Sequence, residues 1–427
     1  MSFGNNVIYH IYPLGMCGAP AKNDGKCMPR IKRVGEWAPY ISSLGCSAVY
    51  LGPVMESGTH GYDTHDYTRL DCRLGTNGDF EEVCRILHEN GLKIILDGVF
   101  NHVGRGFFAF RDLCEKKQAS RYKDWFCVNF EGNSPYGDGF WYEGWEGHYE
   151  LVRLNLANPA VCDYLVSCAL EWIRIFDIDG LRLDVAYLLR EDFLRRLADA
   201  CRREKDGFFL LGEMIHGDYN RLLSVLDSVT NYECYKGLYS AFNSMNLFEI
   251  GHSLNRQYGS EPWCLYRGKH LASFADNHDV TRLASILTRK EHLTPLYGLL
   301  FAMPGIPMIY YGSEWGITGE KKSGDAALRP EIAVPSPNSL TDFIRKAAKI
   351  RKNEPALSDG DFKIEWMTNR QLAFSRNLGN ESVLCIVNAD EAEAAVPGNL
   401  VGGELLLGTS NSDFIEPFGV RYTKFKR

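Results

Sequence analysis

Short apolar runs alternate with longer helical patterns along most of this 427-residue chain. Such alternation indicates β/α units, in which each strand joins a parallel sheet. Eight is the number of strands that a closed barrel needs, so the pattern predicts an α/β protein built on a (β/α)8 TIM barrel. The candidate strands are Val7–Tyr12, Ala48–Leu51, Lys93–Val99, Gly180–Val185, Phe208–Gly212, Ser228–Tyr232, Leu271–Ala275 and Met308–Tyr311.

Two helices between these runs have clear end signals. In the segment 79–91, Phe80, Val83 and Leu87 fall on one helical face, and Gly91 supplies a left-handed stop. Asn158 and Pro159 place a capping residue before a proline at the first helical position, where the missing N–H costs nothing.

One interval breaks the alternation. More than fifty residues rich in glycine and aromatic side chains separate Asn101 from Asn158. A structureless loop of that length is improbable in a compact domain, so we expect a small subdomain, residues 103–150, inserted after strand 3 above the mouth of the barrel. The barrel then comprises residues 1–102 and 151–352.

The pattern changes after Lys352. Residues 353–360 are typical of a linker, and β-type runs follow at Gln371–Arg376 and Ser382–Asn388, with turn signals after each. Residues 353–427 are therefore expected to form a C-terminal antiparallel β-sandwich.

Composition limits the compartment and the partners. The 13 cysteines are an odd number without metal-binding spacing, which favours free thiols in a reducing compartment. The N-terminus has no basic and apolar leader, so we expect a cytoplasmic protein. No apolar stretch is long enough for a membrane span, and the net charge of −7 argues against a nucleic-acid partner.

Acidic residues end four of the strand-like runs, in Asp97–His102, Gly180–Asp184, Gly212–Glu213 and Phe274–Asp279. The carboxyl ends of barrel strands meet at one mouth, so the acids of the last three segments are expected to share a site. Retaining cleavage of an acetal needs two carboxyl groups about 5–5.5 Å apart, one as nucleophile and one as proton donor.

Arg182 precedes Asp184 by two residues, which places both side chains on one face of a strand. Its guanidinium is expected to favour the ionised form of Asp184. The like charges of Asp184 and Asp279 are expected to raise the pKa of Glu213 and keep it protonated.

Taken in order, the four segments resemble the signature segments of the α-amylase family of glycoside hydrolases (glycoside hydrolase family 13). The resemblance implies that Asp184 is the nucleophile, Glu213 the general acid and base, and Asp279 the third catalytic acid. It also implies that sugar is bound by Tyr62, His102, Arg182, His278, Asp325 and Arg329. Trp141, Tyr142 and Trp145 are either further sugar platforms or the core of the insertion.

The run Leu151-Val-Arg153-Leu-Asn155 departs from the pattern of calcium-dependent members, because arginine stands at the usual position of the ligating aspartate. No cofactor is therefore expected. Arg153, together with Asp184–Ala186 and Gly212–His216, is most similar to the neopullulanase, cyclomaltodextrinase and maltogenic amylase branch. The N-terminal domain by which that branch dimerises is lacking here, which predicts a monomer or weak oligomer with a more open cleft.

These observations predict a retaining α-glucan hydrolase that cleaves α-1,4-glucosidic bonds of starch-derived maltooligosaccharides. Its partner would be an α-glucan oligosaccharide or polysaccharide, with cyclodextrins or pullulan as additional substrates. Two alternatives remain open. One is a transglycosylase, in which a sugar rather than water intercepts the same covalent intermediate. The other is a carbohydrate-binding module that has lost catalysis.

Overall fold

A closed barrel of eight parallel strands forms the centre of the computed structural model, which describes residues 5–426. The sheet runs in the order β13-β12-β11-β5-β2-β1-β15-β14, and a parallel bridge between Thr230 and Ala272 joins its two edges. The predicted barrel is therefore confirmed, although the last strand begins at Ile306 rather than Met308. The strands are β1 (Ile8–Ile11), β2 (Ala48–Leu51), β5 (Lys93–Gly98), β11 (Gly180–Leu183), β12 (Phe209–Gly212), β13 (Ser228–Val229), β14 (Ala272–Phe274) and β15 (Ile306–Tyr310).

The strands are buried on both faces, which explains their almost continuous apolar sequence. Alternate residues of β1 belong to different cores. Ile8 packs inside the barrel with residues such as Ile95 and Met308, whereas Tyr9 and Ile11 pack against the surrounding helices. This alternation follows from the two-residue period of a strand, because successive side chains point to the inside and the outside of the closed sheet.

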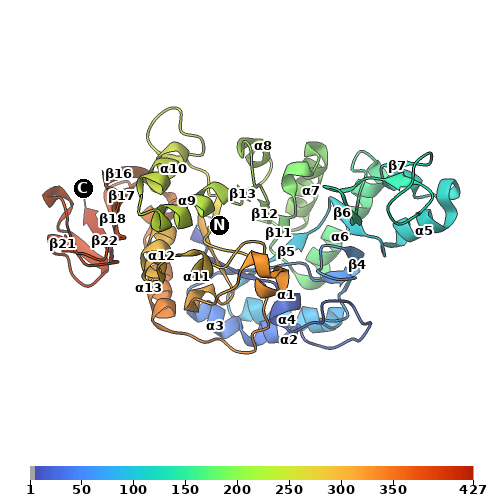
Figure 1. Ribbon diagram of the computed structural model, residues 1–427, viewed down its shortest axis with the longest axis horizontal. Coiled ribbons are helices and arrows are strands. Elements are labelled where there is room, and N and C mark those ends of the chain that lie inside the picture. The colour runs from blue at the N-terminus through green and yellow to red at the C-terminus, as the bar shows by residue number, and fades with distance from the viewer. Residues whose placement is uncertain (1–4, 427) are drawn as a thin grey trace.

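Helices surround the barrel, as Figure 1 shows. The two helices with the clearest sequence signals form as predicted: Thr76 caps α4, Asn158 caps α6, and Gly91 has a φ of +73° just after α4. None of the helices in residues 5–426 is long and apolar enough to cross a membrane. The main helices are α3 (Ala38–Ser43), α4 (Asn77–Glu89), α6 (Pro159–Phe176), α7 (Glu191–Glu204), α8 (Asn220–Leu223), α9 (Tyr232–Asn243), α10 (Phe248–Tyr258), α12 (Leu293–Ala302) and α13 (Ser339–Asn353).

The long interval between β5 and α6 contains secondary structure of its own. It forms the antiparallel sheet β6-β10-β9, the pair β7-β8 and helix α5, and it lies at the far end of the molecule from the C-terminal sheet (Figure 1). The expected boundary at residue 150 falls within β10. The elements are β6 (His102–Gly104), α5 (Phe108–Lys116), β7 (Val128–Asn129), β8 (Trp141–Tyr142), β9 (Gly144–Trp145) and β10 (His148–Arg153).

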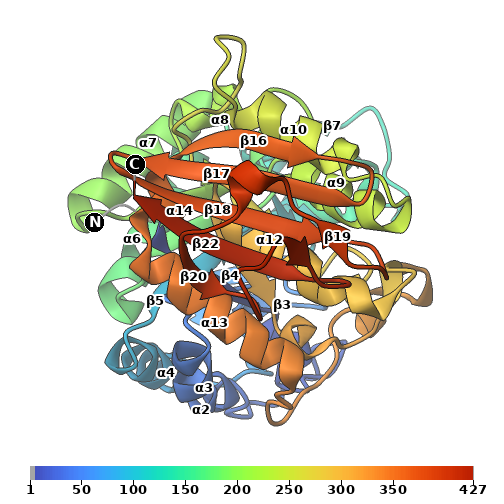
Figure 2. The same ribbon diagram turned by 90° about the vertical axis from the view of Figure 1, so that its left-hand side faces the viewer.

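The C-terminal part is a five-stranded antiparallel sheet, β16-β17-β18-β22-β20, which faces the viewer in Figure 2. A short pair, β19-β21, encloses a small second core that includes Leu384, Ile386 and Ile415. The expected linker is instead partly helical, because Pro355 suits the first position of α14 (Pro355–Asp359). The strands are β16 (Asp361–Met367), β17 (Gln371–Leu378), β18 (Glu381–Asn388), β19 (Ala394–Ala395), β20 (Glu404–Leu407), β21 (Phe414–Ile415) and β22 (Val420–Lys426).

Close packing joins this sheet to the barrel. Gly298 of α12 lies against Val420 of β22, and a Cβ atom at position 298 would come within 2.6 Å of Val420 Cγ1. Two buried arginines lie near this junction, and one of them, Arg376, donates across it. Arg351 donates to the carbonyl of Phe301 (2.8 Å), and Arg376 donates to the carbonyls of Leu357 (2.5 Å) and Gly360 (2.9 Å).

Burial lowers the pKa of Arg376 to about 9 and that of Arg351 to about 10, so both side chains remain charged at neutral pH. Arg376 also donates to the carbonyls of Ala302 and Ser358. A single guanidinium thus donates to backbone carbonyl groups of the barrel and of the segment that leads to the C-terminal sheet. A buried carbonyl group without a donor would destabilise the fold.

We expect Arg376→Met to destabilise the protein by about 2–3 kcal/mol, because it leaves several buried carbonyl groups without donors. A fall of several degrees in the midpoint of thermal unfolding would show this. Arg370→Met is the matched control, since Arg370 is exposed and pairs with Asp390. Equal midpoints for the two variants would contradict the role assigned to Arg376.

Candidate active site

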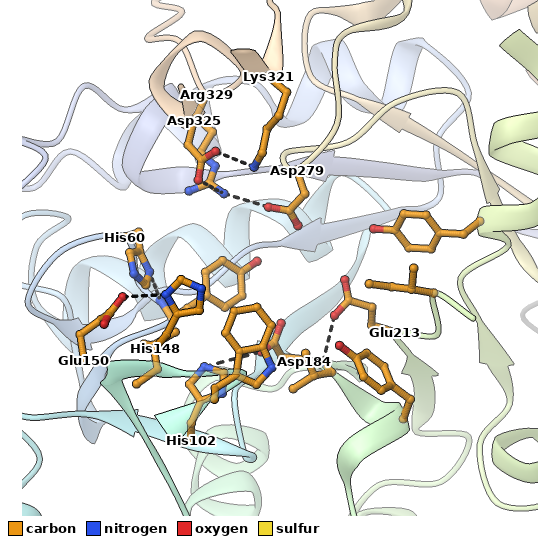
Figure 3. A pocket seen from close by; sticks show the side chains of 17 residues that line it. His60, His102, His148, Glu150, Asp184, Glu213, Asp279, Lys321, Asp325 and Arg329 are labelled. Carbon is orange, nitrogen blue, oxygen red and sulfur yellow. Dashed lines mark hydrogen bonds and ion pairs between the residues drawn. The ribbon is translucent and has the colours of Figure 1, made fainter. Parts of the chain in front are cut away.

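Three acids converge at the mouth of the barrel. Asp184, Glu213 and Asp279 lie beyond the carboxyl ends of β11, β12 and β14, and all three line one cavity of about 470 Å³. Figure 3 shows their carboxyl groups around a common space. The sequence prediction placed them together because barrel strands deliver their C-terminal residues to one face.

One guanidinium connects the first two acids. Arg182 Nη1 lies 2.7 Å from Asp184 Oδ1, and Arg182 Nη2 lies 2.7 Å from Glu213 Oε1. All three side chains are less than a tenth exposed. Because a single planar group contacts both carboxyl groups, those groups must be neighbours. The predicted proximity of Arg182 and Asp184 on one strand face is confirmed.

Asp97 supports this arginine from the neighbouring strand β5. Its Oδ1 accepts from Arg182 Nη1 at 2.9 Å, and its Oδ2 accepts from the hydroxyls of Tyr50 (2.7 Å) and Tyr62 (3.1 Å). The parallel register pairs Arg182 with Asp97, so the ion pair follows from strand alignment. Asp97 fixes where Arg182 points.

Asp279 belongs to a second network on the other side of the cavity. Its carboxylate lies 2.8 Å from His278 Nε2 and 2.9 Å from Arg329 Nη2. Tyr62 Oη lies 2.5 Å from the same His278 nitrogen, and Asp325 lies 3.3 Å from Arg329. Four of the predicted sugar-binding residues are therefore connected to one carboxylate.

The electrostatics of the first two acids differ from the sequence expectation. Burial raises the pKa of Glu213; Arg182 opposes that shift, and the negative charge of Asp279 adds to it. Contact with Arg182 favours the ionised form of Asp184, as expected from the sequence, but burial is the larger effect and raises the pKa of Asp184 overall. The negative charge of Glu213 raises the pKa of Asp184 further.

Asp279 is held in its charged form. Burial alone would raise its pKa, but contact with His278 and the charge of Arg329 keep the pKa well below its usual range. The site therefore contains one acid with a lowered pKa facing two acids with raised pKa values. Such a separation of pKa values is how one cavity supports acid and base chemistry at the same pH.

His102 lies on the floor of the cavity. Its Nε2 is 3.9 Å from Asp184 Oδ2, and burial lowers the pKa of the imidazole to about 3. The side chain is therefore neutral. Nε2 is buried, and among the described residues it has no hydrogen-bond partner.

The insertion contributes a wall that sequence reasoning identified only in part. Trp145 lines the cavity, whereas Tyr142 packs in the core of the insertion and Trp141 lies outside, with its Nε1 3.1 Å from Tyr149 Oη. His148 and Glu150, 3.2 Å apart, also reach the cavity from the hairpin formed by β9 and β10. Figure 3 shows them beside His60. The sequence shows that these two residues are polar but not in which direction the hairpin folds, so it could not place them at the cavity.

Other lining residues come from loops after the strands. Lys321 pairs with Asp325 at 2.6 Å above the cavity. On the side of Glu213 the walls are apolar or aromatic, formed by Tyr187, Ile215 and Tyr232. A cavity with carboxyl groups at its centre, hydroxyl-binding groups on one side and aromatic rings on the other is suited to a sugar chain.

Comparison with known proteins agrees with this arrangement. Residues 22–334 match the family description "Alpha amylase, catalytic domain". The chain is 32% identical over 377 residues to a cyclomaltodextrinase of Geobacillus thermopakistaniensis, which covers 84% of this chain and 62% of that protein. It is 30% identical over 364 residues to an intracellular maltogenic amylase of Bacillus subtilis, covering 82% of this chain and 60% of the relative. The chain thus spans about three-fifths of the length of these two relatives.

A solved structure resembles the whole chain. The cyclic α-maltosyl-(1→6)-maltose hydrolase of Arthrobacter globiformis superposes with a TM-score of 0.85 at 25% identity, and the match covers 99% of each chain. The eight-stranded barrel, the order of the segments that end its strands and the extent of the sequence match lead to one conclusion. The chain belongs to the α-amylase family.

Proposed function

We propose that this protein is a retaining glycoside hydrolase that cleaves α-1,4-glucosidic bonds of maltooligosaccharides. The observation that carries the proposal is the contact of one Arg182 guanidinium with both Asp184 and Glu213. It keeps two carboxyl groups adjacent, as a mechanism through a covalent intermediate requires. The relatives named cyclomaltodextrinase and maltogenic amylase support an α-glucan as the substrate.

In the proposed mechanism, Asp184 attacks the anomeric carbon. Arg182 engages Oδ1, which leaves Oδ2, near His102, as the attacking oxygen. As the new ester bond forms, the glycosidic bond breaks, and Glu213 gives its proton to the departing oxygen. Glu213 then takes a proton from water, whose oxygen displaces Asp184 from the sugar and restores both carboxyl groups.

Asp279 acts on the same sugar without bonding to carbon. Its charge is fixed by His278 and Arg329, so it can accept hydrogen bonds from ring hydroxyls as positive charge develops at the anomeric carbon. Tyr62 and His102 would contact this sugar, and Asp325 with Arg329 the next one toward the non-reducing end.

Glu213→Gln tests the assignment of the acid. We expect kcat/KM on maltotriose to fall by about 10³-fold, because glutamine cannot protonate the leaving oxygen. Release of glucose and maltose by the wild type and the variant is the measurement, with thermal unfolding as a check on the fold. Glu131→Gln, at an exposed position of the insertion, is the control and should keep the wild-type rate. Near wild-type turnover by Glu213→Gln would remove the acid from the mechanism.

Asp279→Asn tests the electrostatic link between the acids. The negative charge of Asp279 favours the protonated form of Glu213 and so raises its pKa. Removing that charge should lower the pKa of Glu213, and the basic limb of the pH profile of kcat/KM should move to lower pH. The residual hydrolysis of maltotriose by the variant, followed across pH, measures this. A limb that stays in place or moves to higher pH would contradict the link.

We further propose that no calcium ion is held at the position of Arg153, which follows the inserted subdomain. Arg153 pairs with Glu143 there, and β10 places Arg153 opposite His102 in register. A guanidinium offers no oxygen ligand and repels a divalent cation. Elsewhere in residues 5–426, Glu56, Asp71 and Cys72 lie close together, but Arg73 neutralises Asp71 at 2.7 Å.

Hydrolysis of maltotriose should accordingly survive prolonged incubation with an excess of EDTA, followed by removal of the chelator. The rates before and after treatment, together with metal analysis of the protein, provide the measurement. Loss of activity that calcium alone restores would overturn this proposal.

We also propose a cytoplasmic location. All 13 cysteines carry free thiols in the structure, and most of them are buried, as suits a reducing compartment. The similar maltogenic amylase of Bacillus subtilis is described as intracellular.

A further inference from the structure

A second groove adjoins the catalytic cavity on the side of Glu213. Its volume is about 920 Å³, and it lies between α9, α10 and the loop that follows β12. Ile215 and Tyr232 line both the catalytic cavity and this groove. The two spaces therefore share a wall.

A row of tyrosine rings leads away from the shared wall. Tyr232, Tyr235 and Tyr239 recur at intervals of three and four residues, so they lie on one face of α9. Their ring centroids are 6.1 Å apart for the first pair and 5.2 Å apart for the second. Tyr232 and Tyr239 are only partly buried, which leaves ring surface for a ligand.

The polar groups of the groove are of both signs. Glu233 pairs with Arg256, Lys236 is exposed on α9, and Glu249 accepts from Ser240 Oγ at 2.8 Å. A groove with near-balanced charge has little preference for an ionic ligand. Aromatic rings interspersed with hydrogen-bonding groups are suited to a neutral chain of sugars, because each sugar has apolar C–H faces and hydroxyl edges.

The groove begins on the side of the cavity from which the leaving group of the proposed reaction would depart. The segment that follows Glu213 in sequence, Ile215–Asn220, forms one of its walls. Figure 3 shows Glu213 on the side of the cavity opposite His60, His148 and Glu150. Since Glu213 protonates the oxygen of the leaving group, the leaving part of the substrate departs on the side where the groove begins.

We propose that the groove between α9 and α10 binds the reducing-end glucose units of α-glucan chains that extend beyond the leaving sugar. This inference rests on the proposed function. It assigns binding roles to Tyr239 and to the neighbouring face of α10, which no sequence signal indicated. Its consequence is a preference for longer chains that arises outside the catalytic cavity.

The test compares kcat/KM for maltoheptaose and maltotriose in the wild type and in two groove variants. Ser253→Trp places a bulky ring on the α10 side, where Ser253 is half-buried, and Tyr239→Ala removes a ring on the α9 side. We expect the ratio of maltoheptaose to maltotriose to exceed one in the wild type. It should fall about tenfold in Ser253→Trp and about two- to tenfold in Tyr239→Ala. Ser43→Trp, exposed on α3 and outside the groove, should keep the wild-type ratio.

A wild-type ratio in both groove variants would overturn the inference, and so would an equal loss on both substrates. These results would leave the proposed function intact, because the wild type would still hydrolyse maltotriose. A wild-type protein that hydrolyses neither substrate would instead reject the proposed function, and the assignment of the groove with it.

Discussion

The organisation of the site depends on the Arg182 guanidinium. It contacts carboxyl groups from three successive strands of the barrel order: Asp97 within β5, Asp184 after β11 and Glu213 after β12. Three buried acids in such proximity would repel one another without it. The arginine therefore permits the burial of the acids, and that burial in turn gives Asp184 and Glu213 their raised pKa values.

The electrostatic arrangement around Asp279, on the opposite wall of the cavity, is different. Asp279 must remain charged in a buried position, and His278 and Arg329 provide that stabilisation. Tyr62 Oη contacts both Asp97 and His278, so it connects the Arg182 network to the Asp279 network. The two networks therefore meet at a single hydroxyl group.

Much of this could be predicted from the sequence because the relevant information is local. Each barrel strand is an apolar run, and the acid after it reaches the common mouth whatever the details of the intervening helix. The proximity of Arg182 to Asp184 followed from the two-residue period of a strand. The effect of Arg182 on the pKa of Asp184 was predicted with the right sign. The larger opposing effect of burial was not predicted, because sequence spacing shows the nearby charge but not the loss of water around a buried carboxyl group.

The contributions of His148, Glu150 and the α9–α10 groove could not be predicted in the same way. The first two depend on how the β9–β10 hairpin folds over the barrel, a matter of long-range packing. The tyrosines of α9 have the spacing of side chains that pack in a core on one helix face. Only the three-dimensional arrangement shows that Tyr232 and Tyr239 remain partly exposed.

The groove and the catalytic cavity are aligned by Tyr232. Its hydroxyl accepts from Asn277 Nδ2 at 3.1 Å, and its ring packs on Phe274 of β14 at 5.0 Å. Both partners belong to the segment that ends at Asp279, so the first ring of the groove is anchored to the same strand end as Asp279. A glucan chain that stacks on α9 would thus be held in a fixed relation to Asp279. Binding energy from distant sugar units could then serve to orient the bond that is cleaved.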